Sequence, residues 1–490
     1  MNWKRTKQGG WGMFKSVARS FSILTAATII EAVITFLFLA FVAREFGPAL
    51  FGKYILIKVS VHIASVLVNA GVAPIAFREL ARHRDNASDL FNDILSLRLV
   101  LSLVAYLVLI LAVAWSNESP EYLMLIAITG LTLVIEPFTG SYHAYYTAHE
   151  RMGVPSAYSV ATAGLSALAG GILLIAGFGL FELIVSNVVV AFTVGLIWTA
   201  HFRTRILQFR FRVQFSAWRR LMLLIIPFAP IHAANQVNRV LNIFLLGRIS
   251  GPLPMEQSIG YYSPANSVGN TIVRLVMGMR RALIPAITVA LSQGHSVTRE
   301  IDTTLKLVIA VFCLPLILST AYMSPEIISL LFGDQYTPSA TVLLMLGWAA
   351  ALQIAAFVPE SFLFSHSDHK LQDYIAGPVI SVLINALLCI LLIPEYGIIG
   401  AAAAAIVGRF VYFLFVAYYY RRQTPGRSLG LNSFWDTIAL MISSFCVWHF
   451  TFIWIENAWL AFAVATSVTL PLLVAFLLYL RTQFSIQTTE

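Results

Sequence analysis

Apolar runs of about 20 residues recur along the chain, and they constrain its fold more than any other feature. A helix of that length crosses a hydrocarbon core of about 30 Å, and a backbone in lipid must satisfy its hydrogen bonds internally. Only 11% of the residues are charged, against about a quarter in soluble domains. The sequence therefore predicts an all-α integral membrane protein.

Charges, glycines and prolines divide these runs into fourteen predicted helices. The predicted helices lie at residues 20–43, 54–74, 95–115, 122–145, 155–177, 180–200, 221–247, 259–280, 303–324, 339–365, 372–393, 397–419, 433–455 and 458–480. Lys and Arg test this map independently, because they gather in the cytoplasmic links of membrane proteins. Of the 32 Lys and Arg residues, 24 fall in the links and ends of one side. An even number of helices with both termini in the cytoplasm follows.

The same map argues against several other classes of protein. The net charge of +9 is spread over short links rather than one folded face, so it indicates membrane topology and not nucleic-acid binding. Cys313, Cys389 and Cys446 lie in apolar runs without metal-ligand spacing, so we expect no metal site and no disulfide. The link 199–220 carries six Arg residues and is interpreted as an interfacial segment at anionic headgroups, with a regulatory or partner site as the alternative.

Paired landmarks indicate an internal repeat. The link Arg44–Tyr54 is similar to the region around Ile259–Tyr262, and Ala176–Phe181 is similar to Pro394–Gly400. Because each copy then holds an even number of helices, the two copies insert in the same orientation, a common transporter plan with the substrate path between two lobes. Chance similarity of apolar sequence is the alternative. The predicted domains are an N-terminal lobe 1–211, a C-terminal lobe 212–425 and two further helices in 426–490.

Cations inside predicted helices are the first candidates for substrate binding. An Arg at the centre of a membrane helix costs about 2.5 to 3.5 kcal/mol, so it faces a cavity or a partner. Arg239 shares a helical stripe with His232 and Asn235, and Arg274 lies deep in the next helix. A structural carboxylate for Arg239 and a helix-to-helix hydrogen bond for Arg274 are the alternatives. The remaining candidate cavity cations are Arg98 and Arg409, for which extension to the headgroups is the simpler interpretation.

Three acids are candidates for ion coupling. Glu31 lies in the middle of the first predicted helix, where it could carry a coupling proton or bind sodium, or form a fixed ion pair. Glu136 precedes Pro137, and Glu360 follows Pro359 at a similar place in the second lobe. A proline frees a backbone carbonyl, so these positions suit gating or ion contact, with a purely structural kink as the favoured alternative.

Four short motifs give the chain a family resemblance. They are Phe46–Tyr54, Ile259–Ala265, Leu331–Tyr336 and Tyr396–Ala402. In their order and spacing the chain resembles the polysaccharide transporter family, of the O-antigen flippase type, within the multidrug, oligosaccharidyl-lipid and polysaccharide exporter superfamily. The resemblance implies two pseudo-symmetric six-helix bundles in a V shape around a central cavity, with two additional C-terminal helices.

The resemblance also implies a function, a location and partners. Members of this family move oligosaccharides on undecaprenyl diphosphate from the cytoplasmic to the periplasmic leaflet of a bacterial inner membrane by alternating access. The implied partners are membrane lipids and the polymerase and chain-length proteins of O-antigen or exopolysaccharide synthesis. No cofactor is expected beyond a coupling proton or sodium ion.

Two other functions are alternatives. An ion-coupled multidrug exporter of the same superfamily should line its cavity with acids and aromatic residues, whereas the deep charges here are mostly Arg. A membrane polysaccharide polymerase or glycosyltransferase needs clustered acids or a large loop, and the sequence contains no Asp-x-Asp, His-Glu-x-x-His or phosphate-binding glycine motif. The sequence therefore predicts a transporter and not an enzyme.

Overall fold

Helices account for almost all of the chain in its computed structural model. The structure describes residues 10–83, 87–116, 119–149, 151–205, 210–292, 298–366, 371–424 and 431–486, and within these ranges it contains no strand. Each of the fourteen predicted helices has a counterpart, so the predicted all-α membrane fold is confirmed. Nine helices in the described ranges are long and apolar enough to cross a membrane. Two of the nine, Thr25–Arg82 and Ala376–Gln423, each contain two of the predicted helices.

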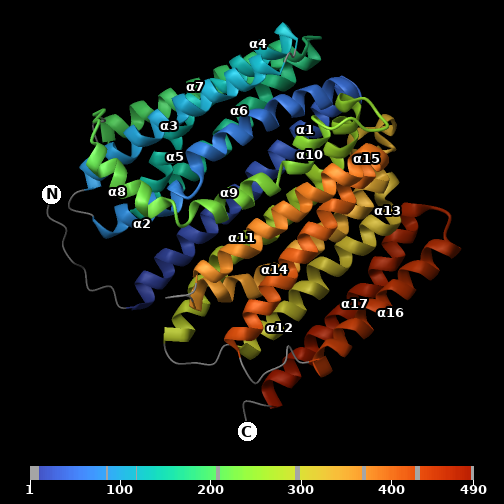
Figure 1. The fold of residues 1–490 in the computed structure, drawn as a ribbon. Coiled ribbons are helices and arrows are strands. Elements are labelled where there is room, and N and C mark those ends of the chain that lie inside the picture. Colours follow the sequence, from blue (N-terminus) through green and yellow to red (C-terminus); the bar gives the residue numbers. More distant parts are fainter. Residues whose placement is uncertain are drawn as a thin grey trace. The chain divides into compact units, whose positions relative to one another are not determined.

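The helices pack into two compact units, coloured blue to green and green to red in Figure 1. Unit 1 comprises residues 1–45 and 54–240, and unit 2 comprises residues 46–53 and 241–490. The helices of unit 1 are most of α1 (Gly10–Asn69), α2 (Val72–Arg82), α3 (Ala87–Trp115), α4 (Pro120–Gly130), α5 (Thr132–Ala148), α6 (Gly153–Ile175), α7 (Leu180–Arg205), α8 (Phe215–Ile225) and α9 (Ala229–Asn238).

Unit 2 contains the remaining helices and a short segment of α1. Its helices are α10 (Leu241–Leu246), α11 (Met255–Ser292), α12 (Thr298–Val308), the π-helix η2 (Ile309–Cys313), α13 (Leu314–Phe332), the 3-10 helix η3 (Asp334–Tyr336), α14 (Ser339–His366), α15 (Leu371–Gln423), α16 (Leu431–Trp454) and α17 (Ala458–Ile486). The units differ from the predicted domains 1–211, 212–425 and 426–490, because α8 packs on α2 and α3, and because α16 and α17 pack on α13.

Glycines and prolines place the helix breaks. Gly47 has φ 69°, outside the helical region, so two helical segments of α1 meet there at a kink, within the predicted link Arg44–Tyr54. Gly71 has φ 75°, a conformation that favours glycine, and the predicted helix 54–74 therefore ends at Asn69. The predicted helix 221–247 is broken into α8, α9 and α10, with a bend of 65° between α8 and α9. Pro227 and Pro230 lie at that bend, where each removes a helical N–H donor.

Aromatic rings hold α3, α5 and α7 together in unit 1. Tyr142 of α5 stacks on Phe202 of α7 at 4.3 Å between ring centroids, and Phe91 of α3 stacks on Phe202 at 4.9 Å. All three side chains are buried. Stacked aromatic pairs contribute about 0.5 to 1.5 kcal/mol beyond their buried area. The stack therefore fixes α5 against α3, which carry the charged residues described below.

The four sequence motifs are packing elements of unit 2. A Cβ atom at Gly52 would overlap the carbonyl of Glu256, and a Cβ atom at Gly260 would overlap the carbonyl of Pro48, so two helices approach closely here. Phe51 of the first motif also packs edge-on against Tyr336 of the third, with ring centroids 6.1 Å apart. Close contact between these motifs stabilises the fold of unit 2.

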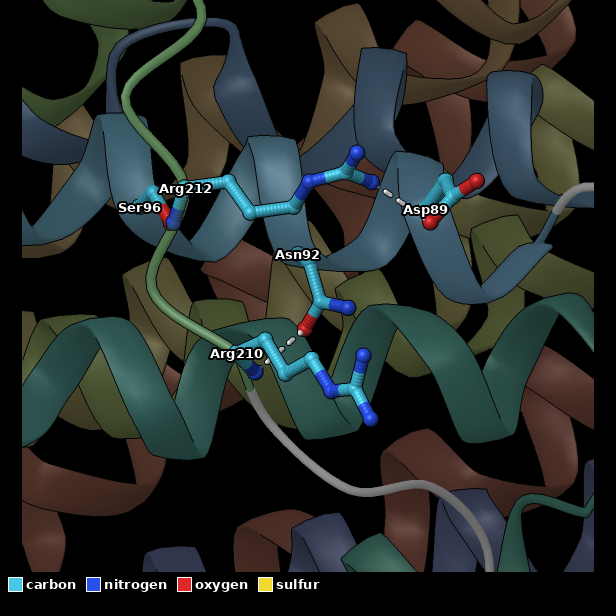
Figure 2. Close-up of polar contacts among 5 residues, drawn as sticks. All are labelled: Asp89, Asn92, Ser96, Arg210 and Arg212. Atoms are coloured by element: carbon cyan, nitrogen blue, oxygen red, sulfur yellow. Dashed lines mark hydrogen bonds and ion pairs between the residues drawn. The ribbon is translucent and has the colours of Figure 1, made fainter.

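The link between α7 and α8 is bound to the first turns of α3 (Figure 2). The backbone N–H of Arg210 donates to Oδ1 of Asn92 at 3.1 Å, and that of Arg212 donates to Oγ of Ser96 at 3.1 Å. The guanidinium of Arg212 also pairs with Asp89 at 2.7 Å. Part of the Arg-rich link is thus held by α3 within unit 1.

Candidate functional site

A cavity of about 900 Å³, with both polar and apolar lining residues, lies within unit 1. Residues of α1, α2, α3, α5, α6, α7 and α9 line it. Its charged lining residues are Glu31, Lys58, Arg98 and Glu136. A smaller cavity of about 240 Å³ shares Lys58 and Glu136 with the larger one, so the two adjoin at Glu136. Ligand pockets in proteins have volumes of about 300 to 1,000 Å³, so the larger cavity is of ligand size.

Three side chains form a charged cluster on the cavity wall. Nη2 of Arg98 donates to Oδ1 of Asn69 at 2.5 Å, and Nδ2 of Asn69 donates to Oε1 of Glu136 at 2.5 Å. Asn69 therefore bridges a cation of α3 and an anion of α5. Arg98 is only 2% exposed. The interpretation that Arg98 extends to the headgroups is wrong, because its guanidinium is enclosed by its own unit.

Gly140 makes room for this guanidinium. A Cβ atom at Gly140 would lie 2.5 Å from Nη2 and 2.7 Å from Nη1 of Arg98. Nη1 of Arg98 reaches Oγ of Ser141 only at 3.5 Å, and its Nε–H has no acceptor among the described residues. A buried donor without an acceptor costs about 1 to 3 kcal/mol. The cluster is thus closely packed but incompletely hydrogen-bonded.

Residues with hydroxyl groups line the same cavity as the charged cluster. They are Thr35, Thr132, Thr139, Thr147, Ser159, Thr162 and Ser166. The amides of Asn187 and Gln236 and the rings of Tyr158 and Trp198 complete much of the polar and aromatic lining. Such a wall can exchange hydrogen bonds with a polyhydroxylated ligand, while Arg98 supplies a positive charge at depth.

The structure brings four of the nine predicted site residues to this cavity. Arg98, Glu136, Glu31 and His232 line it. The predicted stripe of His232, Asn235 and Arg239 divides, because His232 lines the cavity whereas Asn235 and Arg239 are exposed and do not. Gln236, one turn after His232 and not part of the predicted stripe, also lines the cavity.

The other three predicted residues lie in unit 2 and line no part of this cavity. Arg274 of α11 is exposed, and within the described ranges no hydrogen bond or ion pair involves it. Arg409 of α15 is partly buried. Glu360 of α14 is 5% exposed and does have interaction partners. Their proposed roles stay predictions.

Sequence reasoning missed Asn69, which joins the two charges. A signal was present, because an Asn followed closely by Gly71 inside an apolar run is typical of a helix end. A helix end places a polar side chain where the next turn of helix no longer covers it. The hydroxyl groups of the wall were also missed, since Ser and Thr are common in membrane helices and carry no distinctive spacing.

A second polar cluster lies in unit 2, between α10 and α15. Nδ2 of Asn242 donates to the carbonyl of Ala401 at 2.7 Å and to Oδ1 of Asn385 at 3.2 Å. Nδ2 of Asn385 donates back to Oδ1 of Asn242 at 3.0 Å. Asn242 and Asn385 are 5% and 1% exposed. Across the described ranges, no three His, Cys, Asp or Glu side chains gather as metal ligands in either unit.

Comparison with known sequences places the chain among polysaccharide biosynthesis proteins. The family model of that description matches residues 17–291, more than half of the chain. An uncharacterized membrane protein of Methanocaldococcus jannaschii is 30% identical over 134 residues, which span 26% of this chain and 24% of that relative. The chain thus matches about a quarter of the relative's length.

Comparison with solved structures defines the fold. The lipid II flippase MurJ in an inward closed conformation superposes with a TM-score of 0.73 at 14% identity, over 96% of this chain and 99% of that chain. An inward-facing multidrug resistance MATE family transporter of the MOP superfamily gives 0.61 at 12% identity, over 82% and 96%. A MOP superfamily transporter from Pyrococcus furiosus gives 0.57 at 13% identity, over 84% and 97%. The fold is that of MOP superfamily transporters, and the family resemblance found from the sequence is confirmed.

Proposed function

Because the chain belongs to the polysaccharide biosynthesis protein family and has a MOP transporter fold, we propose that it is a flippase for lipid-linked oligosaccharides. Its substrate is an oligosaccharide on undecaprenyl diphosphate, which it moves from the cytoplasmic to the periplasmic leaflet by alternating access. The product enters O-antigen or exopolysaccharide synthesis. The protein resides in a bacterial inner membrane with both termini in the cytoplasm, and it delivers its substrate to a polymerase and chain-length proteins.

Within the structure, the unit 1 cavity is the observation that most strongly supports this proposal. A flippase must give a glycan and a diphosphate a polar route while the lipid tail stays in hydrocarbon. Hydroxyl and amide groups on the cavity wall suit the glycan, and Arg98 suits the diphosphate, since a guanidinium donates to phosphate oxygens in a fixed fork. A volume of about 900 Å³ accommodates a few sugar rings rather than a single small ion.

Two acids of the same cavity are candidates for coupling transport to an ion gradient. Glu31 and Glu136 both line it, so a proton or sodium ion bound at either changes the charge seen by the substrate. Arg239 and Asn235 of unit 1 and Arg274 and Arg409 of unit 2 are further proposed substrate-binding residues outside this cavity. Glu360 of unit 2 is a third proposed ion-coupling residue.

A reconstituted flipping assay tests the proposal. The purified full chain is placed in vesicles with a fluorescent undecaprenyl-diphosphate oligosaccharide, and a membrane-impermeant quencher reports the fraction left in the outer leaflet. We expect quenching to proceed beyond the outer-leaflet half only in vesicles that contain the protein. Equal quenching with and without protein, across imposed proton and sodium gradients, would contradict the proposal.

A multidrug exporter is the second candidate, because the fold is also that of a MATE family transporter. The charges of the cavity do not separate the two functions, because Asn69 joins Arg98 to Glu136 and Glu31 is a second acid on the wall. Efflux of ethidium from the same vesicles, without any flipping of the glycolipid, would favour the exporter.

A further inference from the structure

The charge of Arg98 is neutralised inside unit 1, although its side chain lines the cavity. Its guanidinium donates to Asn69, and Asn69 donates to Glu136. The cluster therefore carries one positive and one negative group joined through a neutral amide. An anion that enters the cavity therefore competes with Glu136 for electrostatic interaction with the guanidinium of Arg98.

The direction of both hydrogen bonds is fixed by the groups that they join. A guanidinium has only donors and an ionised carboxylate has only acceptors, so the Asn69 carboxamide must turn its oxygen to Arg98 and its nitrogen to Glu136. Asn69 is the last residue of α1, and Gly71, with φ 75°, turns the chain into α2 immediately afterwards. The helix end thus presents this amide to both charges.

Protonation of Glu136 weakens the interactions that hold Arg98 and Asn69 in this arrangement. A neutral carboxyl accepts a hydrogen bond from Asn69 more weakly and no longer attracts Arg98. The guanidinium already has few partners here, because only Nη1 and Nη2 have acceptors among the described residues. An oxyanion in the cavity would supply the acceptors that it lacks.

We propose that Asn69 is the positioning residue of a masked anion site. While Glu136 is ionised, Asn69 holds Arg98 to it. When Glu136 binds a proton, Arg98 turns to an oxyanion in the cavity, so anion binding and proton uptake occur together. The inference rests on the proposed function in taking the diphosphate of the lipid-linked glycan as this oxyanion.

Other titratable groups also face this region. They are Lys58 and His62 of α1, Glu31 of α1, His143 of α5 and His232 of α9. Within the described ranges, Glu136 is the carboxylate that the Asn69 amide joins to Arg98. Replacing Glu136 alone should therefore remove most of the pH dependence of anion binding, while the other groups adjust its strength.

Sulfate is a suitable probe, because it is a divalent oxyanion that does not titrate between about pH 5.5 and pH 8, where a perturbed carboxyl can titrate. Its affinity for the purified full chain in lipid nanodiscs is measured by calorimetry in buffers of different ionisation heat. For the unmodified chain we expect affinity about tenfold tighter at the lower pH, with net proton uptake. Glu136→Gln should bind sulfate tightly at both pH values without proton uptake.

Asn69→Leu separates positioning from charge. With Arg98 no longer held to Glu136, sulfate affinity at the higher pH should rise toward that of Glu136→Gln. Glu182→Gln is the matched control, because Glu182 accepts from the N–H of Gly179 at the start of α7 and lines neither cavity. It should keep the pH dependence of the unmodified chain. Glu136→Gln retains the shape of the side chain, so it tests the inference even if Asn69→Leu does not fold.

The same pH dependence in Glu136→Gln as in the unmodified chain would overturn the inference, as would sulfate binding without proton uptake. Either outcome is compatible with glycolipid flipping in the vesicle assay. Conversely, proton-linked sulfate binding without any flipping would contradict the proposed function and leave the masked anion site in place.

Discussion

The two units differ in the charge and hydrogen bonding of the polar cluster that each one buries. Each unit buries a polar cluster among apolar helices. In unit 2 the amides of Asn242 and Asn385 are neutral and donate hydrogen bonds to each other. In unit 1 the cluster of Arg98 and Glu136 is charged, and Nε of Arg98 has no acceptor among the described residues. The amide pair is sealed by its unit, while the charged cluster borders a cavity. A satisfied neutral pair needs no ligand. The charged cluster retains unused donors next to a space in which a ligand fits.

Removing the Arg98 charge gives the largest expected effect. Arg98→Met should lower the flipping rate at least about 100-fold, because truncating one member of a buried hydrogen-bonded charge pair costs about 2 to 5 kcal/mol. The measurement is the rate of glycolipid flipping in vesicles at matched protein content. Since the single change leaves Glu136 uncompensated, Arg98→Met with Glu136→Gln should restore thermal stability but not flipping. Flipping at the normal rate in the double variant would show that the cluster is only structural.

Breaking the amide pair of unit 2 should affect stability instead of substrate binding. Asn242→Leu removes the donor to the carbonyl of Ala401 and one of the donors to Asn385, whose Oδ1 also accepts from Sγ of Cys389. This should cost about 1 to 3 kcal/mol and lower the thermal midpoint in detergent. Adding Asn385→Leu should recover part of this loss, because both partners are then apolar. A double variant less stable than the single variant would contradict this interpretation of the pair.

Crowding the guanidinium should have an intermediate effect. Gly140→Ala places a Cβ atom 2.5 Å from Nη2 of Arg98, so the side chain must move, and we expect about a tenfold slower flipping rate. Gly171→Ala is the matched control, since a Cβ atom there meets nothing within 4 Å and the site is also helical. Equal flipping rates in the two variants would indicate that the position of Arg98 does not matter.

Loosening the link on α3 should have the smallest effect. Asp89→Asn removes an exposed ion pair with Arg212, which contributes about 0.2 to 1 kcal/mol and is weakened by salt. The backbone bonds to Asn92 and Ser96 stay in place. A small drop in thermal midpoint at low salt that disappears at high salt is expected, with no change in flipping rate. A large loss of flipping would assign the link a role in transport.

The sequence predicts the helices of this protein well because membrane helices must be long, apolar and internally hydrogen-bonded. It is less successful where a helix breaks. Gly71, Pro227 and Pro230 interrupt runs that remain apolar, so periodicity and length did not predict these breaks. At Gly47 the predicted break is confirmed, because its backbone is not helical and two helices meet there at a kink.

The candidate site could be predicted only in part. A charge within an apolar run is conspicuous, so Arg98, Glu136 and Glu31 were all identified. Which charges meet depends on helix rotation and packing, which a single sequence does not specify. Arg239 illustrates this limit, because it follows the last residue of α9 and is exposed, while His232 lines the cavity.

Access of water and substrate to the unit 1 cavity determines whether this cavity can bind the lipid-linked oligosaccharide. Thr139→Cys places a thiol on the cavity wall, in a Cys446→Ser background because Cys446 is exposed and the other two cysteines are buried. The rate of reaction with a membrane-impermeant thiol reagent is measured with and without the lipid-linked oligosaccharide. We predict that the thiol reacts readily and that the oligosaccharide slows the reaction. A thiol as unreactive as the buried cysteines, or a rate that the oligosaccharide leaves unchanged, would contradict the account.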